Sequence, residues 1–269
     1  SQWTTVTCIA APDGRLAWAT ATGVLNLCSF TTGAVEATLV SSVRPVWALC
    51  PLTDGTNRLL SGGADAIIAL HELDAAHGRA AINPAREYSG HTRAIRAIVE
   101  LPGGRFASAS DDRTVRIWAI ESGACLATLH GHTNCVVALA VADDDTLVSG
   151  GADKTLRVWD TRTYAAIVMF DTPSLLTSLL RLPDGTVASG HGDGIVRLWD
   201  WRRREAVGAL RGHKARDRLR CLAQLPDGRL ASASRDKVVR IWDVAARACV
   251  GVVTVQWPIN CFCVTADGG

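Results

Sequence analysis

The chain is poor in methionine and in two of the aromatic residues, and it has no long apolar run. Its 269 residues include one methionine, two tyrosines and four phenylalanines. The longest purely apolar run, about residues 135–142, is far shorter than the roughly 20 residues that cross a bilayer. No basic region followed by an apolar stretch opens the sequence, so we expect neither membrane insertion nor a secretory leader. Because the sole methionine is Met169, we expect the chain to begin after processing or to be an excerpt of something longer.

The chain has nine cysteines, an odd number, and no zinc-binding spacing. A disulfide framework is not expected in a chain of this length. We interpret the cysteines of apolar, strand-like segments as small buried side chains; these are Cys8, Cys50, Cys135, Cys221, Cys261 and Cys263. We therefore expect an intracellular, reducing compartment (cytoplasm or nucleus), and we expect no metal and no cofactor.

An internal repeat is the main signal that is present. Four segments align, each with a serine first and a tryptophan ten residues later: residues 108–118, 149–159, 189–199 and 232–242. The tryptophan spacings of 41, 40 and 43 residues are typical of a four-stranded propeller blade. Two decayed copies bring the total to six; they are residues 18–28 and 61–71, with Cys28 and His71 at the tryptophan place.

Each copy predicts strands joined by tight turns. In Leu-Pro-Asp-Gly at residues 225–228, proline fixes φ and glycine accepts a positive φ, so a turn joins the first two strands. The Asp112-Arg113 pair then turns the chain into a third strand at residues 114–118, where Val115 and Ile117 share one face. The pattern predicts an all-β fold.

Together these features resemble the WD-repeat β-propeller family over essentially the whole chain. Gly-His dipeptides at residues 90–91, 131–132 and 212–213 complete the family's pattern. The resemblance implies a single β-propeller domain of four-stranded antiparallel blades over residues 1–269. Its repeat units are expected at residues 1–31, 32–74, 84–121, 122–162, 163–202 and 203–245, with a partial unit at 246–269.

The resemblance also implies a buried polar chain in three blades, in which tryptophan donates to serine, serine to histidine and histidine to aspartate. Its members are His91, Ser108, Asp112 and Trp118; His132, Ser149, Asp153 and Trp159; and His213, Ser232, Asp236 and Trp242. A Ser-His-Asp set also fits a hydrolase, which we reject because a catalytic site has no reason to recur at blade spacing. The fifth blade is expected to lack the histidine, with His191 isolated. His71 is interpreted as a packed substitute for tryptophan.

The number of blades is left open by the sequence. We count twenty-five strands, the last two at residues 248–255 and 259–264, so six whole blades leave one strand over and seven lack three. Residues 259–269 resemble the inner strand and first turn of a new blade. We therefore favour a seven-bladed design seen incompletely; the alternative is a six-bladed ring whose last strand packs elsewhere.

Partners of such propellers are expected on the face that carries the loops entering the inner strands. By position, this face has Trp47, Arg93, Arg96, Asn134, Lys214, Arg216, Arg218, Arg220, Arg235, Trp257 and Asn260. Trp47, Arg96 and Arg220 stand out because tryptophan and arginine are enriched in binding hot spots. The alternative is that Trp47 plugs the central channel and the arginines are only solvated.

Charge is concentrated in one region of the chain. Residues 201–220 hold eight basic and two acidic residues, whereas the whole chain has a net charge of +2. We expect a non-catalytic protein–protein interaction scaffold within a larger assembly, with acidic partners. A nucleic-acid-binding propeller that uses residues 202–220 is the alternative, and solvated loop charge is a third reading. No phosphate loop, metal spacing or carboxylate pair indicates an enzyme.

Overall fold

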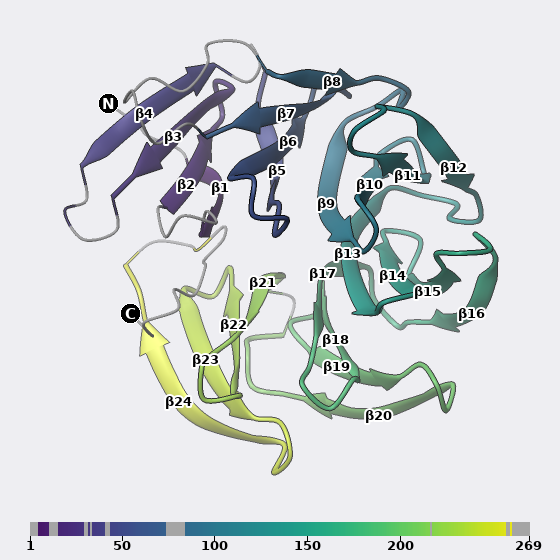
Figure 1. Ribbon diagram of the computed structural model, residues 1–269. Helices are drawn as coiled ribbons and strands as arrows, with labels where there is room; N and C mark the ends of the chain where they lie inside the picture. The colour runs from purple at the N-terminus through teal and green to yellow at the C-terminus, as the bar shows by residue number, and fades with distance from the viewer. Residues whose placement is uncertain are drawn as a thin grey trace. The chain divides into compact units, whose positions relative to one another are not determined.

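The computed structural model consists of six four-stranded antiparallel sheets, each with its strands in chain order (Figure 1). The structure describes residues 5–10, 16–29, 32, 34–40, 44–73, 84–215, 217–256 and 259. Within these ranges it has no helix long and apolar enough to span a membrane. We name the sheets blades one to six in chain order. They fall into two compact units, with blades one to three in residues 1–130 and blades four to six in residues 131–269.

Every blade of the first unit is built from consecutive strands. Blade one has β1 (Thr5–Ala10), β2 (Leu16–Thr20), β3 (Val24–Cys28) and β4 (Val35–Val40). Blade two has β5 (Val46–Pro51), β6 (Arg58–Gly63), β7 (Ile68–Glu72) and β8 (Arg86–Tyr88). Blade three has β9 (Ile95–Leu101), β10 (Arg105–Ser110), β11 (Val115–Ala119) and β12 (Cys125–Leu129).

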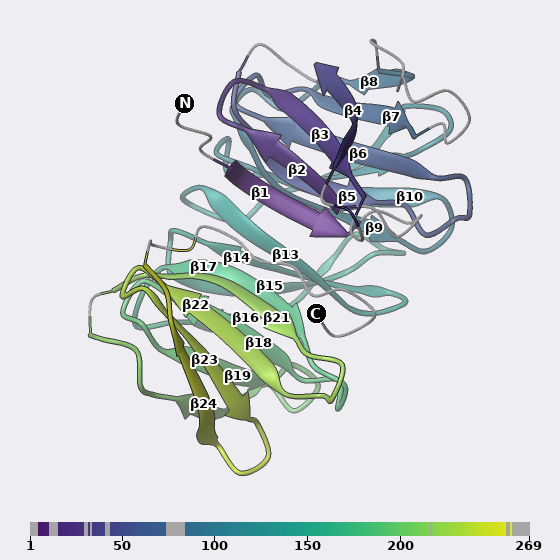
Figure 2. The ribbon, with the colours of Figure 1, turned by 90° about the vertical axis from the view of Figure 1, so that its left-hand side faces the viewer.

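The second unit repeats the same plan, and Figure 2 shows the strands of its blades side by side. Blade four has β13 (Val136–Asp143), β14 (Thr146–Gly151), β15 (Thr155–Asp160) and β16 (Ala166–Asp171). Blade five has β17 (Leu176–Arg181), β18 (Val187–His191), β19 (Val196–Asp200) and β20 (Glu205–Leu210). Blade six has β21 (Leu219–Gln224), β22 (Leu230–Ser234), β23 (Val238–Asp243) and β24 (Ala248–Thr254).

The turn between the second and third strand of each blade is set by local chemistry. In blade three, the Asp112 carboxylate accepts the backbone N–H of Thr114 at 2.9 Å, and in blade four that of Asp153 accepts the N–H of Thr155 at 3.1 Å. The intervening residue has a positive φ, 75° at Arg113 and 63° at Lys154. An aspartate that hydrogen-bonds two residues ahead holds this turn, which explains why an acidic residue stands before each third strand of blades two to six.

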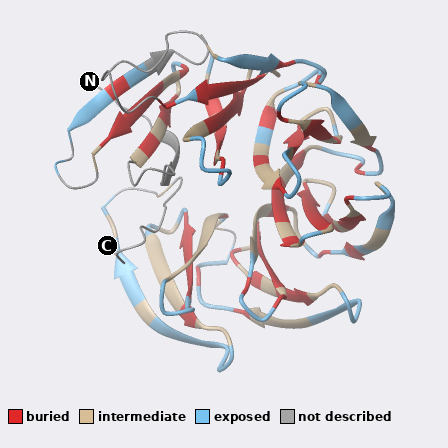
Figure 3. Ribbon diagram, viewed as in Figure 1, coloured by how far each residue is buried: buried red, intermediate tan, exposed pale blue. Residues whose placement is uncertain are grey.

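The core of each unit lies between neighbouring blades. Trp118 and Phe106 of blade three pack in one cluster with Tyr88 and other residues of blade two, and Trp199 of blade five packs with Val158 of blade four. Glycine in the second strand lets the next blade pack closely. A Cβ on Gly150 of blade four would lie 2.6 Å from the Leu176 side chain of blade five. In blades two to six, burial is greatest in the second strand and least in the fourth (Figure 3).

The fold confirms the all-β class and the four-stranded antiparallel blades. It describes twenty-four strands rather than twenty-five, because the strand expected at residues 259–264 lies outside the described residues apart from Ile259. The seventh blade is therefore not confirmed and stays a prediction, as do the proposed repeat boundaries. Of the six cysteines expected to be buried, Cys50 is buried and Cys135 and Cys221 are half-buried. The side chains of Cys8, Cys261 and Cys263 lie outside the described residues.

Candidate functional site: polar chains and inner-strand loops

Blades three, four and six each contain a buried chain of four hydrogen-bonded side chains. In blade three, Trp118 Nε1 donates to Ser108 Oγ at 2.8 Å, Ser108 Oγ lies 2.8 Å from His91 Nε2, and His91 Nδ1 lies 2.7 Å from Asp112 Oδ2. Blades four and six repeat these contacts at 2.8, 2.8 and 2.9 Å, through Trp159, Ser149, His132 and Asp153 and through Trp242, Ser232, His213 and Asp236.

The direction of the bonds follows from the carboxylate. Burial opposes ionisation of Asp112, but hydrogen bonds from Thr114 and His91 outweigh it and lower its pKa to about 2. An ionised carboxylate only accepts, so His91 donates through Nδ1 and its Nε2 accepts from the Ser108 hydroxyl. Burial lowers the pKa of His91, which keeps the ring neutral. The chain therefore ties the third strand, the second strand and the preceding loop together.

The polar chain of blade five takes its histidine from the second strand and not from the loop before the first strand. This histidine is His191, which was expected to be isolated, so that expectation is wrong. Trp199 Nε1 donates to Ser189 Oγ at 2.6 Å, and Ser189 Oγ lies 2.7 Å from His191 Nε2. His191 Nδ1 donates to the Ser174 carbonyl at 3.0 Å. The imidazole thus comes from β18 itself, two residues after the serine. Burial lowers the pKa of His191 to about 4.

Blades one and two keep shortened versions of the same arrangement. In blade two His71 replaces the tryptophan, with its Nε2 2.9 Å from Ser61 Oγ, and burial lowers its pKa to about 4. His71 is 2% exposed, as expected of a packed substitute. In blade one the large and small residues are exchanged. Trp18 takes the serine place and donates through Nε1 to the sulfur of Cys28, at the tryptophan place, at 3.1 Å.

The polar chains cannot act as nucleophilic sites in this geometry. Ser108, Ser149, Ser189 and Ser232 are all 0% exposed. Each hydroxyl also accepts an indole N–H, which occupies the oxygen that would have to attack a substrate. Within the described ranges, no three His, Cys, Asp or Glu side chains gather closely enough to hold a metal ion.

In the first unit, three side chains at the inner-strand ends form one cluster. The Arg96 guanidinium lies 4.2 Å from the centroid of the Trp47 ring. It also donates through Nε and Nη2 to the two carboxylate oxygens of Asp111, at 2.7 and 2.6 Å. Trp47 is half-buried and the Arg96 side chain is 37% exposed. Arg93, predicted for the same face, is exposed in the loop before β9.

In the second unit, the predicted residues cluster around the start of β21. Lys214 and Arg218 are exposed in the loop before this strand, Arg220 is half-buried on it, and Arg235 is exposed after β22. The backbone N–H of Arg235 donates to the Arg218 carbonyl at 3.1 Å, so these segments are adjacent. Asn134 is exposed before β13. Arg216, Trp257 and Asn260 lie outside the described residues.

Two further basic residues of the 202–220 region, Arg202 and Arg203, have carboxylate partners. Arg202 pairs with Asp143 at 3.1 Å and lies 4.4 Å from the Trp201 ring, and Arg203 pairs with Asp200 at 3.5 Å. They occupy the turn between β19 and β20, whereas Lys214 and Arg218 follow β20. Connections at the two ends of one strand lie at opposite ends of a blade, so the basic residues are divided between two places.

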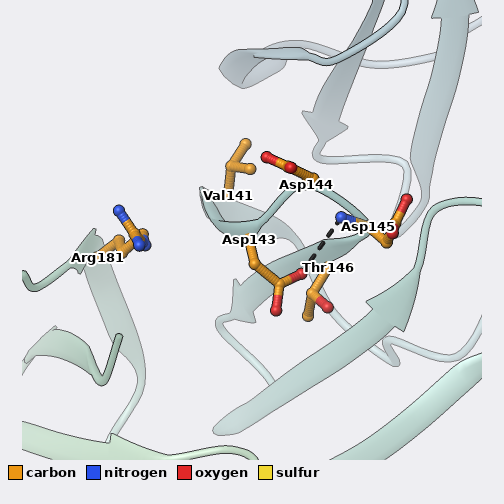
Figure 4. A pocket seen from close by; sticks show the side chains of 6 residues that line it. All are labelled: Val141, Asp143, Asp144, Asp145, Thr146 and Arg181. Atoms are coloured by element: carbon orange, nitrogen blue, oxygen red, sulfur yellow. Dashed lines mark hydrogen bonds between the residues drawn. The ribbon is translucent and has the colours of Figure 1, made fainter. Parts of the chain in front are cut away.

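A hollow of about 800 Å³ in the second unit was not expected from the sequence. Three consecutive aspartates lie on one side of it and Arg181 lies on the other (Figure 4). Asp143 pairs with Arg202, Asp145 pairs with Arg162 at 2.6 Å, and Arg181 Nε donates to the Ala142 carbonyl at 2.7 Å. Most of its charged groups are therefore engaged within the protein. The run of three aspartates was the available sequence signal.

A family model described as "WD domain, G-beta repeat" matches four segments of the chain. They are residues 82–119, 123–160, 171–200 and 204–243, which together make up just over half of it. Blades three to six lie within or overlap these segments.

Individual relatives match over shorter stretches. The chain is 35% identical over 65 residues to ribosome biogenesis protein YTM1 of Saccharomyces cerevisiae, which covers 24% of this chain and 13% of that protein. It is 33% identical over 87 residues to mitochondrial division protein 1 of Kluyveromyces lactis, covering 30% and 12%. It is 47% identical over 43 residues to the ribosome biogenesis protein BOP1 homolog of Drosophila virilis, covering 16% and 6%. The match thus spans a small part of each relative.

Removal of the shared serine hydroxyl tests the polar chain. We expect Ser149→Ala to lower the free energy of unfolding by about 1–3 kcal/mol, because the Trp159 N–H and the His132 ring nitrogen would be left buried without a partner. Thr133→Ala is the control, since Thr133 is exposed and bonds Asp153 through its backbone. Urea unfolding at neutral pH measures both variants. Equal stability of the two would contradict a structural role for the chain.

The buried histidines predict a loss of stability on acidification. His71 and His191 have a pKa of about 4 in the fold against 6.5 ordinarily, so the unfolded chain binds more protons below pH 6.5. As the pH falls from neutral towards 4, uptake of this proton lowers the free energy of unfolding by on the order of 3 kcal/mol for each histidine. Asp112 adds a further loss between about pH 4 and pH 2.

Urea unfolding of the wild-type chain and of His191→Gln across this range measures the effect. We expect the variant to have the shallower dependence on pH, because it lacks one titrating group. A slope equal to that of the wild type would show that His191 does not titrate as its burial requires.

Proposed function

The chain belongs to the WD40 repeat family, and on that premise we propose that it is a non-catalytic scaffold that binds protein partners at the inner-strand ends of its blades. The proposal is supported by the different positions of the two kinds of polar group in a blade. The serine and histidine side chains of the polar chains are hydrogen-bonded inside the blade, where the serine hydroxyls are 0% exposed. The groups that vary from blade to blade stand at the strand ends, where a partner can reach them.

The observation that carries the proposal is the cluster of Trp47, Arg96 and Asp111. Tryptophan and arginine dominate binding hot spots. Arg96 is held in place by the bidentate bond to Asp111 and by the Trp47 ring. A side chain that is already ordered loses less conformational entropy when a partner binds. The cluster therefore offers a pre-organised, partly apolar surface with a charged rim.

The proposal extends to a larger assembly in an intracellular setting. Two of the three relatives described above are named for ribosome biogenesis and one for mitochondrial division. Because each match covers at most 13% of the relative, we propose from these relatives only that the chain is a domain of a longer protein or a subunit of a larger assembly. A shared fold does not by itself transfer a pathway.

Nucleic-acid binding by residues 202–220 is the second candidate, and the contacts favour it less. Arg202 and Arg203 are already paired with carboxylates, and Arg202 lies over the Trp201 ring that a base would stack on. Lys214 and Arg218, for which the described residues show no carboxylate partner, lie at the other end of the strands, where no second stacking ring is described. Retention of RNA at physiological salt with a steep salt dependence would revive this candidate.

Partner capture by the full-length protein tests the proposed surface. We expect Arg96→Ala to lower the yield of captured proteins about tenfold or more, because a hot-spot arginine contributes more than a tenfold change in affinity. The free energy of unfolding should fall by only about 1 kcal/mol, from loss of the bonds to Asp111 and of the contact with Trp47, so the variant stays folded. Leu126→Ala, at an exposed position on β12, is the matched control. Affinity purification with mass spectrometry compares the three proteins, and an unchanged capture profile for Arg96→Ala would place the interface elsewhere.

A further inference from the structure

Blades three and six place the same two strand-end positions side by side but fill them with different charges. Ile95 pairs with Ser110 in blade three, and Leu219 pairs with Ser234 in blade six. The residues that follow are Arg96 and Asp111 in blade three, and Arg220 and Arg235 in blade six. The backbone contacts agree, since Asp111 N–H donates to Ala94 at 2.9 Å and Arg235 N–H donates to Arg218 at 3.1 Å.

In blade three, the two positions neutralise each other. The carboxylate of Asp111 receives both bonds of the Arg96 guanidinium, at 2.7 and 2.6 Å. The distance between the two positions therefore suits a bidentate arginine–carboxylate pair, which is a strong and directional hydrogen-bonded contact.

In blade six, the carboxylate is missing and a second arginine stands in its place. The Nε of Arg220 is buried and donates no hydrogen bond to any described residue. Asp217 lies in the same loop, but the structure records no ion pair between it and Arg218, Arg220 or Arg235 within the described ranges. Burial lowers the pKa of Arg220, and the charges of Arg235 and Arg218 lower it further. Arginine nevertheless stays protonated at neutral pH.

We propose that Arg220 and Arg235, supported by Arg218, form a receptor for the carboxylate of an aspartate or glutamate in an acidic segment of a protein partner. The partner's carboxylate takes the place that Asp111 fills in blade three. This inference rests on the proposed scaffold function and names the chemistry of one partner. It also explains a like-charged pair that is unfavourable in the free protein and becomes favourable when an anion lies between the two guanidinium groups.

Two exchanges of charge test the receptor in both directions, with a fluorescein-labelled peptide of alternating aspartate and glutamate as the probe. Fluorescence anisotropy on the full chain at about 0.1 M salt, where exposed charges are screened beyond about 10 Å, reports the binding. Arg235→Asp supplies the missing carboxylate internally, so we expect affinity for the peptide to fall about tenfold or more and the melting temperature to rise. Asp111→Arg recreates the blade-six arrangement in blade three, so we expect a second peptide site.

The controls separate this receptor from general attraction to positive charge. Arg229→Gln removes one positive charge from the opposite end of blade six, where Arg229 pairs with Asp227, and should leave peptide affinity unchanged. The matching peptide of asparagine and glutamine should not bind. Equal peptide affinity for Arg235→Asp and Arg229→Gln overturns the proposal. Tighter binding of inorganic phosphate or oligothymidine than of the acidic peptide, lost in Arg235→Asp, overturns the assignment to a carboxylate.

The two proposals fail separately. If Arg96→Ala abolishes partner capture while Arg235→Asp has no effect on the peptide, the receptor is wrong and the scaffold function stands. If Arg235→Asp releases the peptide but neither Arg96→Ala nor Arg235→Asp changes any captured protein, the anion site exists and the scaffold function at the inner-strand ends is wrong.

Discussion

In blades three to six, the fold depends on one serine hydroxyl that is shared between an indole and an imidazole. In blade four, Ser149 accepts from Trp159 and donates to His132, which in turn donates to the carboxylate of Asp153. The three bonds join the second strand, the third strand and the loop that enters the blade. Because all these groups are buried, an unpaired member would cost more than its bond contributes, so the chain acts as a unit. Burial lowers the pKa of His91 in blade three and of His213 in blade six, which links the stability of those blades to pH.

Fixing each blade from within leaves the strand ends free to differ. At the same pair of positions, blade three has Arg96 bonded to Asp111, and blade six has two arginines. The backbone register is the same in both, so the two blades differ at these positions in their side chains. A repeat fold can in this way carry an internally satisfied pair in one blade and a receptor for an external anion in another. Inside blades three, four and six, the described residues have the same four residue types in the polar chain. Each of these side chains hydrogen-bonds to the next, so a change in one would leave its neighbour without a partner.

The sequence predicted the parts of the fold that recur and missed those that occur once. Tryptophans at blade spacing, with turn residues between them, were enough to predict four-stranded blades. The role of His191 was missed because it comes from the second strand and not from the preceding loop; the signal was a histidine where the other blades have a small residue. The contact between Trp18 and Cys28 was missed because large and small residues had changed places. The bond between Arg96 and Asp111 depends on strand register, which spacing along the chain does not show.

Hydrogen exchange at the indole N–H groups, followed by nuclear magnetic resonance, tests the central claim most directly. The groups of Trp118, Trp159, Trp199 and Trp242 each donate to a buried serine. The account predicts that all four exchange only when their blade opens, and far more slowly than the half-buried Trp47, for which the described residues show no hydrogen-bond acceptor. Exchange of any of the four at the rate of Trp47 would show that its blade is not held by the polar chain.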